Sequence, residues 1–532
     1  MKKLYIFLFA LIFLIGVSFR FYKLGVVPNS LSWDEVSWGY NAYSILETGK
    51  DEHGAFLPLS FQAFGDYKQP VYVYLTSSSI KFFGLNAFAV RFPSAFLGSL
   101  TIPFVFLFMY GIFHKENYRK KLSFLAMFFF AISPWSIQFS RVAYEANVGL
   151  FFVITGAALF VLGLVSQRKK YIYFSILPLV ISGYTYHSEK IFTPLLVAGL
   201  LFYAYISFKI NKKTLLIIFL MFLLGSMAWI VDTRTTARGR SVTFISNQTQ
   251  ILAGSTEKLI ADRANNDNLG LLLDNRRIVF FNKYFENYLS HFDLNYLFVN
   301  GDDARHHAYG MGILYLISLP IIIIGLIKID KKKYWLLFFW FLLAPVASSL
   351  AIDAPNSSRS LIFLPTWQIF EALGSYYLLF YKNNYSWKIF KLLIVLLLLI
   401  NVAYFAYNYF FHTNTELDKY WQYGYKQAMD YTRKYLNTGK RIFFANDIEQ
   451  GYIFYLFYNK YDPQKYLSYG GSDRIRDECY SIDNAYFGTC SNRIKKGDIY
   501  VSSKEQSLAH LKIIKKIDFA SGETGVWIFE YL

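Results

Sequence analysis

The sequence predicts an α-helical polytopic membrane protein with a small α/β domain at its C-terminal end. Hydrophobic residues make up 55% of the 532 residues and aromatic residues 20%, including 54 Phe and 44 Tyr. A soluble fold of this length has too little interior to bury so much apolar surface, whereas a lipid bilayer accepts it. Charged residues make up only 17%, and they gather between the apolar runs, as in helical membrane proteins.

Apolar stretches long enough to cross a bilayer as helices recur along the chain. They are residues 4–19, 88–113, 122–139, 147–165, 171–187, 191–208, 214–231, 309–327, 334–352, 360–381 and 389–411. The first resembles a signal peptide, but bulky residues follow it in place of a small-residue cleavage site, so we expect it to remain as the first span. The pattern predicts about eleven spans.

Lysine-rich short loops alternate with the other connections along the chain. They are the N-terminus and residues 114–121, 166–170, 209–213, 328–333 and 381–388. Because positively charged loops stay in the cytoplasm, the other loops, above all 20–87 and 232–308, are expected to be extracytoplasmic. The net charge of +18 largely serves this orientation in the cell membrane. No basic domain interleaved with aromatic residues indicates nucleic acid as a partner.

This topology divides the chain into a transmembrane domain, residues 1–411, and an extracytoplasmic α/β domain, residues 412–532. RIFFAND (441–447) and DIYVSS (498–503) are typical of short strands, and the segment between them has helical spacing up to Pro463. Cys479 and Cys490 also lie in this domain, without the spacing of a metal or redox site. Outside the cytoplasm we expect them to form one disulfide, with two free thiols as the alternative.

The sharpest local signal lies in the first outer loop, in SLSWDEVSWGYNAYSILETG (30–49). Ser32 and Glu35 have the spacing of a capping box, and Gly49 ends the helical pattern. We expect a short amphipathic helix at the outer interface, with its aromatic residues among the lipid head groups. Capping explains Glu35, but it leaves Asp34 without a structural role and hence as a candidate catalytic carboxylate.

Further ionisable residues are expected at the outer ends of spans. Lys68, beside Asp66, stands where a cation can bind a lipid phosphate, although a snorkelling lysine is the alternative. Arg141 and Glu145 are four residues apart, as in an ion pair along a helix, but ionisable groups at a membrane edge are often functional. Weaker candidates for binding substrate or metal are Asp66, His187, Asp303 and His306, and Arg359 is a candidate for binding an anion.

The segment GDDARHHAYG (301–310) offers two carboxylates and two imidazoles. These groups can bind a divalent metal ion, which is the alternative to a role in binding substrate. Adjacent histidines point apart on a helix, which argues against a metal site, so metal dependence stays open and no other cofactor is predicted. The sequence has no Walker A loop, no Rossmann glycine motif and no nucleophile elbow, which disfavours a cytoplasmic enzyme fed by nucleotides. Outer carboxylates and cations at the lipid surface instead favour an activated substrate carried by the membrane.

With these motifs the chain resembles the integral-membrane glycosyltransferases of the C-type (GT-C) superfamily. It is most similar to the protein O-mannosyltransferase family (glycosyltransferase family 39), which includes the lipid A aminoarabinose transferases. The resemblance covers roughly residues 1–380 and rests on an ordered set of motifs. They are WDE (33–35), YKQP (67–70), RFPSAFLGSLTI (91–102), SRVAYEANVGLFF (140–152), YTYHSEKIFTPLL (184–196), FVNGDDARHHAYGMGILYL (298–316) and APNSSRSLIFLP (354–365).

The resemblance implies a GT-C fold and transfer of a sugar, with inversion, from a polyprenyl-phosphate donor to an extracytoplasmic acceptor. Asp34 takes the place of the family's first acidic residue and is the expected general base, supported by Glu35. Lys68 matches a lysine near the donor phosphate, although the run here is Lys-Gln-Pro rather than Lys-Pro-Pro. Glu145 stands where the family usually has Asp. The expected cations for the leaving phosphate are Lys68, Arg141 and Arg359, and an apolar groove between spans is expected to hold the polyprenyl tail.

Two other functions stay open beside this leading hypothesis. A transporter or flippase of lipid-linked sugars needs polar residues at mid-bilayer and repeated halves, whereas the predicted spans are nearly free of charge. A non-enzymatic assembly protein that binds a partner through its C-terminal domain is the third hypothesis. For the leading one, the acceptor is protein Ser/Thr, a lipid or a wall glycan, and the sequence does not name the sugar.

Overall fold

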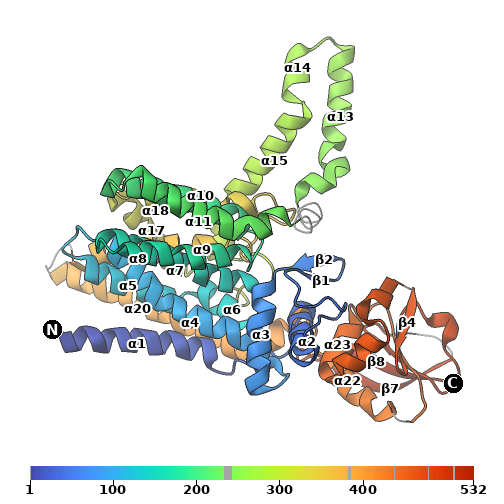
Figure 1. Cartoon of the computed structure of the whole chain (residues 1–532). Helices are drawn as coiled ribbons and strands as arrows, with labels where there is room; N and C mark the ends of the chain where they lie inside the picture. Colours follow the sequence, from blue (N-terminus) through green and yellow to red (C-terminus); the bar gives the residue numbers. More distant parts are fainter. Residues whose placement is uncertain (1, 233–242, 381–384, 437, 477, 507–509) are drawn as a thin grey trace. The chain divides into compact units, whose positions relative to one another are not determined.

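The chain folds into two compact units, which we describe separately (Figure 1). The computed structural model describes residues 2–232, 243–380, 385–436, 438–476, 478–506 and 510–532. Residues 233–242 of the predicted outer loop and 381–384 of the last Lys-rich segment lie outside the described residues. The first unit comprises Met1–Phe19, Leu97–Phe139 and Tyr144–Tyr404, and the second comprises Arg20–Phe96, Ser140–Ala143 and Phe405–Leu532.

Long apolar helices make this chain a multi-pass membrane protein. Within the described ranges, six helices are long and apolar enough to cross a membrane, and α5 with α6, bent by 53°, makes a seventh if the pair is one span. The bend falls at Pro134, which cannot continue the hydrogen bonding of the preceding helix. The helices are α1 (Lys2–Phe21), α4 (Ala87–Ile112), α5 (Arg119–Ile132), α6 (Pro134–Arg141), α7 (Glu145–Val165), α10 (Glu189–Phe208), α11 (Lys212–Val231) and α20 (Tyr385–Tyr407).

The predicted count of about eleven spans is not confirmed, because four predicted spans are short or broken helices. Three of them form helices well short of the roughly 20 residues that cross a bilayer, and the fourth begins as a 3-10 turn. Residues 171–187 form α8 (Lys169–Phe174) and α9 (Ile176–Gly183). The other three stretches form α17 (Ser318–Lys328), α18 (Trp335–Ser348), and η2 (Leu361–Phe363) with α19 (Leu364–Phe380). Between α11 and α17 lie η1 (Phe244–Asn247), α13 (Gln248–Ala264), α14 (Asn268–Leu273), α15 (Arg276–Ser290) and α16 (Leu294–Phe298).

In the first unit, α17 and α19 pack with their backbones nearly in contact. A Cβ atom on Gly325 would lie 2.0 Å from the Phe370 carbonyl oxygen, and one on Gly374 would lie 1.8 Å from the Ile321 carbonyl oxygen. Any side chain larger than hydrogen would therefore force the helices apart, as at other small-residue helix contacts in membranes. The two glycines set the distance between α17 and α19.

The C-terminal part of the second unit is the predicted α/β fold. Its six-stranded sheet has the order β4-β5-β3-β6-β8-β7, and β3 pairs in parallel with both β5 and β6. The predicted strands 441–447 and 498–503 correspond to β3 and β6, and Cys479 and Cys490 are joined by a disulfide. The elements are α22 (Tyr425–Thr432), β3 (Ile442–Phe444), α23 (Gly451–Tyr458), α24 (Pro463–Ser468), β4 (Cys479–Ile482), β5 (Ala485–Gly488), β6 (Ile499–Ser502), β7 (Leu511–Asp518) and β8 (Thr524–Tyr531).

The same unit contains the first outer loop, which the sequence assigned to the transmembrane domain. Its elements are α2 (Trp33–Thr48), β1 (Phe61–Ala63), β2 (Asp66–Lys68) and α3 (Pro70–Phe83). The prediction of an amphipathic surface helix is wrong for α2: it packs against α3 and α23, and it is buried from Glu35 through Ala42. Its aromatic side chains, among them the fully buried Tyr40, contribute to a protein core.

Candidate functional site

The first turn of α2 is fixed by the predicted capping box. The backbone N–H of Ser32 donates to Glu35 Oε2 at 3.1 Å, and the backbone N–H of Glu35 donates to Ser32 Oγ at 3.4 Å. Gly49 ends the helix at a φ of 72°, in the left-handed region where glycine meets no steric penalty. Both predicted helix boundaries are therefore confirmed, and Asp34 lies in a well-defined first turn.

Asp34 and Lys68, predicted separately as a base and a phosphate ligand, form one ion pair. Lys68 Nζ lies 2.5 Å from Asp34 Oδ1, a pairing that the sequence did not predict. The carboxylate side chain is 40% exposed, whereas the lysine side chain is only 7% exposed. Lys68 Nζ also lies 4.6 Å from the ring centroid of Trp38 and 5.1 Å from that of Phe64. Cation–π contacts thus hold the ammonium group beside a carboxylate that solvent and ligands can reach.

Glu35 has a different environment, because it forms a fully buried ion pair with Arg91 of α4. Arg91 Nε donates to Glu35 Oε1 at 2.8 Å and Nη2 donates to Oε2 at 3.1 Å, and both side chains have 0% exposure. The backbone N–H of Ala143 also donates to Glu35 Oε1, at 3.1 Å. The remaining Arg91 donors bind the carbonyl oxygens of Leu24, Pro28 and Ser30. Glu35 therefore anchors α2 to the chain around it.

Sequence reasoning missed Arg91 as a site residue, although a signal was present. An arginine in the first turns of an apolar span is costly unless it is paired, so it indicates a hidden partner. The partner, Glu35, lies 56 residues earlier in the sequence. No local spacing rule connects the two residues.

Arg141 is buried and binds backbone rather than facing the membrane surface. Its Nη1 donates to the Arg20 carbonyl oxygen at 3.2 Å, and its Nη2 donates to the Val27 carbonyl oxygen at 3.0 Å. The guanidinium group also lies 4.8 Å from the ring centroid of Phe410. Arg141 ends α6 and Glu145 begins α7, so the two residues do not share one helix, as the alternative of a helical ion pair requires. Arg141 instead fixes the chain that follows α1.

In the first unit, Glu145 lies near a second carboxylate. It is buried at the start of α7, within electrostatic reach of Glu189. Glu189 reaches over Gly149, where a Cβ atom would lie 2.6 Å from its Oε1. Gly149 thus makes room for the Glu189 side chain one turn along α7. His187 is half-buried in the turn between α9 and α10.

In the segment 301–310, the two predicted candidates Asp303 and His306 have different partners. The carboxylate that binds His306 is Asp302: its Oδ2 lies 2.8 Å from His306 Nδ1 and accepts a hydrogen bond from the backbone N–H of Ser357 at 2.7 Å. Burial opposes the charge on Asp302, but His306 and the Ser357 donors outweigh it and hold the pKa of this carboxyl below its usual value. Asp303 instead binds Arg305 Nε at 3.2 Å.

Two further predicted residues also have protein partners. Arg359 Nη1 lies 2.8 Å from Asp353 Oδ1 in the loop before η2. Asp66 Oδ1 accepts a hydrogen bond from the backbone N–H of Tyr67 at 2.7 Å. Among the residues that the structure describes, no group of three or more His, Cys, Asp or Glu side chains is placed to hold a metal ion.

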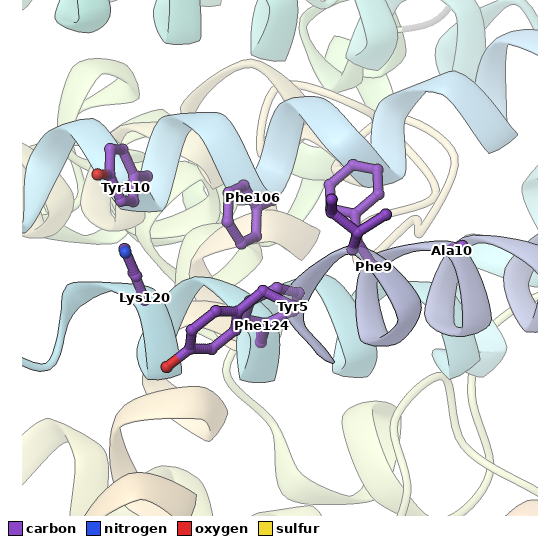
Figure 2. Close-up of a pocket in the computed structure, with 8 residues that line it drawn as sticks. Tyr5, Phe9, Ala10, Phe106, Tyr110, Lys120 and Phe124 are labelled. Atoms are coloured by element: carbon purple, nitrogen blue, oxygen red, sulfur yellow. The ribbon is translucent and has the colours of Figure 1, made fainter. Parts of the chain in front are cut away.

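An apolar groove of about 550 Å³ lies between α1, α4 and α5 (Figure 2). Figure 2 shows aromatic rings from the three helices, with Lys120 at the same end as Tyr110. These residues adjoin the Lys-rich segments predicted to be cytoplasmic, whereas the predicted donor phosphate site is extracytoplasmic. We therefore do not assign the groove to the donor. Its lining residues are Tyr5, Ile6, Phe9, Ala10, Phe106, Tyr110, Lys120 and Phe124.

Comparison with known proteins finds that part of this chain is similar to a family of membrane glycosyltransferases. A model of the dolichyl-phosphate-mannose-protein mannosyltransferase family matches residues 10–232, which include Asp34, Lys68, Arg91 and Arg141. A comparison with curated proteins finds no match. The family match covers the Asp34–Lys68 and Glu35–Arg91 ion pairs but less than half of the chain.

Solved structures extend the similarity in fold over nearly the whole chain. ArnT from Cupriavidus metallidurans bound to undecaprenyl phosphate has a TM-score of 0.56 and 10% identity, covering 99% of this chain and 97% of that chain. The apo oligosaccharyltransferase of Archaeoglobus fulgidus has a TM-score of 0.54 and 14% identity, covering 86% of this chain.

The archaeal oligosaccharyltransferase AglB of Archaeoglobus fulgidus, in complex with an inhibitory peptide and a dolichol-phosphate, has a TM-score of 0.52 and 13% identity, covering 86% of this chain. The present chain spans 64% of the length of each of the two archaeal structures. The fold of the chain is that of the C-type membrane glycosyltransferases, and its resemblance to the protein O-mannosyltransferase family is confirmed over residues 10–232.

Proposed function

We propose that this protein transfers one sugar from a polyprenyl-phosphate donor to an extracytoplasmic acceptor hydroxyl, with inversion at the anomeric carbon. The Asp34–Lys68 pair carries this proposal. It places a half-exposed carboxylate 2.5 Å from a cation inside the segment that the family model matches. A base for the acceptor and a positive charge for the leaving phosphate are the two groups that this reaction requires.

In the proposed step, the acceptor hydroxyl oxygen attacks the anomeric carbon from the face opposite the phosphate. Its proton passes to the Asp34 carboxylate as the new carbon–oxygen bond forms. The bond between the anomeric carbon and the phosphate oxygen breaks, and its electron pair leaves with the polyprenyl phosphate. A phosphodiester thereby becomes a phosphomonoester with more negative charge, which the Lys68 ammonium group stabilises.

Glu35, Arg91 and Arg141 act as positioning residues in this proposal. Their polar atoms bind one another or backbone groups inside the protein, so they hold α2 and the chain after α1 in place. Catalysis by a base depends on hydrogen-bond reach to the acceptor, and a displacement of α2 by about 1 Å is costly. For the other predicted site residues a substrate contact stays a prediction; they are Glu145, Arg359, Asp66, His187, Asp303 and His306.

We propose a polyprenyl phosphate as the lipid carrier of the sugar, because Lys68 offers a cation for its phosphate and because compared structures bind such lipids. ArnT was solved with undecaprenyl phosphate and AglB with a dolichol-phosphate, so two proteins of this fold bind a polyprenyl phosphate. The direct test uses the purified full-length chain and a panel of radiolabelled polyprenyl-phosphate sugars, with extracts of outer-surface material as acceptors. We expect the wild type to transfer label from at least one donor. The Asp34→Asn variant should transfer label from that donor far more slowly. If no donor is consumed by the wild type, the proposal is wrong.

The side of the membrane is part of the proposal and has its own test. With the Lys-rich loops in the cytoplasm, tags at Tyr118, Asn211 and Lys331 should report cytoplasm. Tags at Lys50, Gly270 and Tyr480 should report the outer side. An external tag at Lys331 would contradict the proposed topology.

A sugar-lipid transporter remains the second candidate because one observation favours it. Glu371 is an exception among the predicted spans, which are nearly free of charge. It is buried within the predicted span 360–381 and accepts a hydrogen bond from Ser318. Buried carboxylates among apolar helices are frequent in transport pathways. Movement of labelled lipid-linked sugar across proteoliposomes without any transfer would support this function over the enzyme.

A further inference from the structure

A cavity of about 240 Å³ lies in the sheet of the second unit, apart from the residues assigned to the transferase. Its walls come from the carboxyl ends of β3 and β5, from the segments that follow them, and from β6. The chain leaves β3 toward α23 and returns at the edge strand β4, which pairs with β5. It then runs from β5 to β6 on the other side of β3. In open α/β sheets, ligands bind in the crevice at this kind of reversal of strand order.

Aromatic rings form one wall of the cavity. Phe443 on β3 is in register with Tyr500 on β6 and with Tyr486 on β5, so the three rings lie on one face of the sheet. Phe443 stacks on Tyr486 at a centroid distance of 4.7 Å. Helix α23 covers the opposite face, where Tyr455 contacts Phe487 at 5.7 Å. Of this row, Phe443 and Tyr500 line the cavity and offer it aromatic surface.

Polar groups form the rim. Asn446 Nδ2 donates to Thr489 Oγ1 at 2.8 Å, and both residues are exposed. The Asp447 carboxylate is held by Ser502 Oγ at 2.7 Å and by the backbone N–H of Ser503 at 3.1 Å. The lining residues are Phe443, Phe444, Ala445, Asn446, Asp447, Gly488, Thr489, Cys490, Ile494 and Tyr500. This set contains an amide, a hydroxyl and a carboxylate but no lysine or arginine.

The disulfide secures the rim on the β5 side. Cys490 lines the cavity and is bonded to Cys479, the first residue of the edge strand β4. Cys490 Sγ also lies 3.2 Å from the Phe487 carbonyl oxygen. The disulfide thereby ties the segment that carries Thr489 to the sheet. Because this segment is already ordered, ligand binding costs less conformational entropy.

We propose that this cavity binds one uncharged sugar unit. A pyranose has an apolar C–H face that packs on an aromatic ring and an edge of hydroxyls that bond to amide, hydroxyl and carboxylate groups. Among the described residues, the nearest cation to the aromatic wall, Arg441, lies 5.3 Å from the Phe443 ring centroid and is paired with Asp498. The Asp447 carboxylate on the rim therefore disfavours phosphates and sugar acids. The cavity of about 240 Å³ has room for one sugar ring. The proposal does not depend on the transferase activity.

The test is saturation-transfer NMR on the full-length protein in nanodiscs, with free neutral hexoses, N-acetylhexosamines, a uronic acid and inorganic phosphate as separate probes. We expect at least one neutral sugar to bind. Asn446→Ala, on the exposed rim, and Tyr500→Leu, on the aromatic wall, should each weaken that binding at least tenfold. Gln464→Ala is the matched control, because it removes an exposed amide on α24 outside the cavity and should leave binding unchanged.

One further variant separates this site from the transferase site, and one chemical treatment tests the role of the disulfide. Asp34→Asn should retain sugar binding, so a failure of the proposed transfer reaction leaves this result unchanged. Reduction of the disulfide should weaken binding, because the Thr489 segment loses its tie to β4. Absence of binding by every neutral sugar, binding unaffected by both Asn446→Ala and Tyr500→Leu, or preferential binding of the uronic acid or phosphate would each overturn the proposal.

Discussion

Replacement of Glu35 by Gln should destabilise the protein strongly, although glutamine can also serve in a capping box. In the structure, Glu35 accepts two hydrogen bonds from Arg91 and one each from the backbone N–H groups of Ser32 and Ala143. Glutamine keeps one acceptor oxygen and turns its amide N–H groups toward the Arg91 donors. The Arg91 charge then stays buried without a counter-ion, which costs about 3–5 kcal/mol.

The comparison variant is Asp34→Asn, which changes the adjacent carboxylate in the same way. Asp34 is 40% exposed and loses one ion pair, with Lys68. Pairs with an exposed partner are worth about 1 kcal/mol or less. Thermal unfolding of the purified protein in one detergent should therefore show a much larger fall in Tm for Glu35→Gln than for Asp34→Asn.

A double-mutant cycle with Arg91→Met tests the cause. Arg91 also binds three backbone carbonyls, so its own replacement is destabilising. If the buried pair dominates, the double variant should be more stable than the sum of the single changes predicts, with a coupling of about 2 kcal/mol or more. Equal stability of Glu35→Gln and wild type, or additivity in the cycle, would refute the reasoning.

Three other regions give independent predictions. Burial lowers the pKa of His291 to about 4 from about 6.5 in an unfolded chain. The unfolded state then binds more protons, so stability present above pH 6.5 should be lost as the pH falls toward 4, by up to about 3 kcal/mol. His291→Gln should flatten this Tm–pH profile, and an unchanged slope would exclude His291 as its cause. Gly374→Leu should lower Tm because its Cβ would lie 1.8 Å from the Ile321 carbonyl oxygen, whereas Gly254→Ala, with no atom within 4 Å, should not; equal effects would contradict the tight α17–α19 contact. Non-reducing mass spectrometry should find a peptide bridged by Cys479 and Cys490, and two alkylatable thiols would be the contrary result.

Local signals in the sequence predicted the features that depend on a few neighbouring residues. Ser32, Glu35 and Gly49 fixed both ends of α2 because capping uses side chains within one turn of a helix end. The strands β3 and β6 were predicted because short apolar runs stand between charged and turn-forming residues. The membrane class followed from composition, which needs no knowledge of tertiary contacts.

Features that depend on contacts between distant segments were not predictable in this way. Hydropathy does not distinguish a straight span from α8 and α9, which divide one apolar stretch at Ser175. The burial of α2 depends on α3 and on α23, whose positions the sequence pattern does not contain. The pairing of Asp302 rather than Asp303 with His306 is set by Ser357, 55 residues away.

The most direct test of the central claim is the rate of sugar transfer by Asp34→Asn at equal amounts of folded protein. Asparagine keeps the size of the side chain but cannot accept the proton of the acceptor hydroxyl. We expect transfer to fall by roughly 10²–10⁴-fold, as for loss of a general base, while binding of the lipid donor and the Tm stay near wild type. Glu145→Gln is measured beside it. Wild-type turnover by Asp34→Asn, with loss of transfer in Glu145→Gln, would contradict the assignment of Asp34 and place the base at the start of α7.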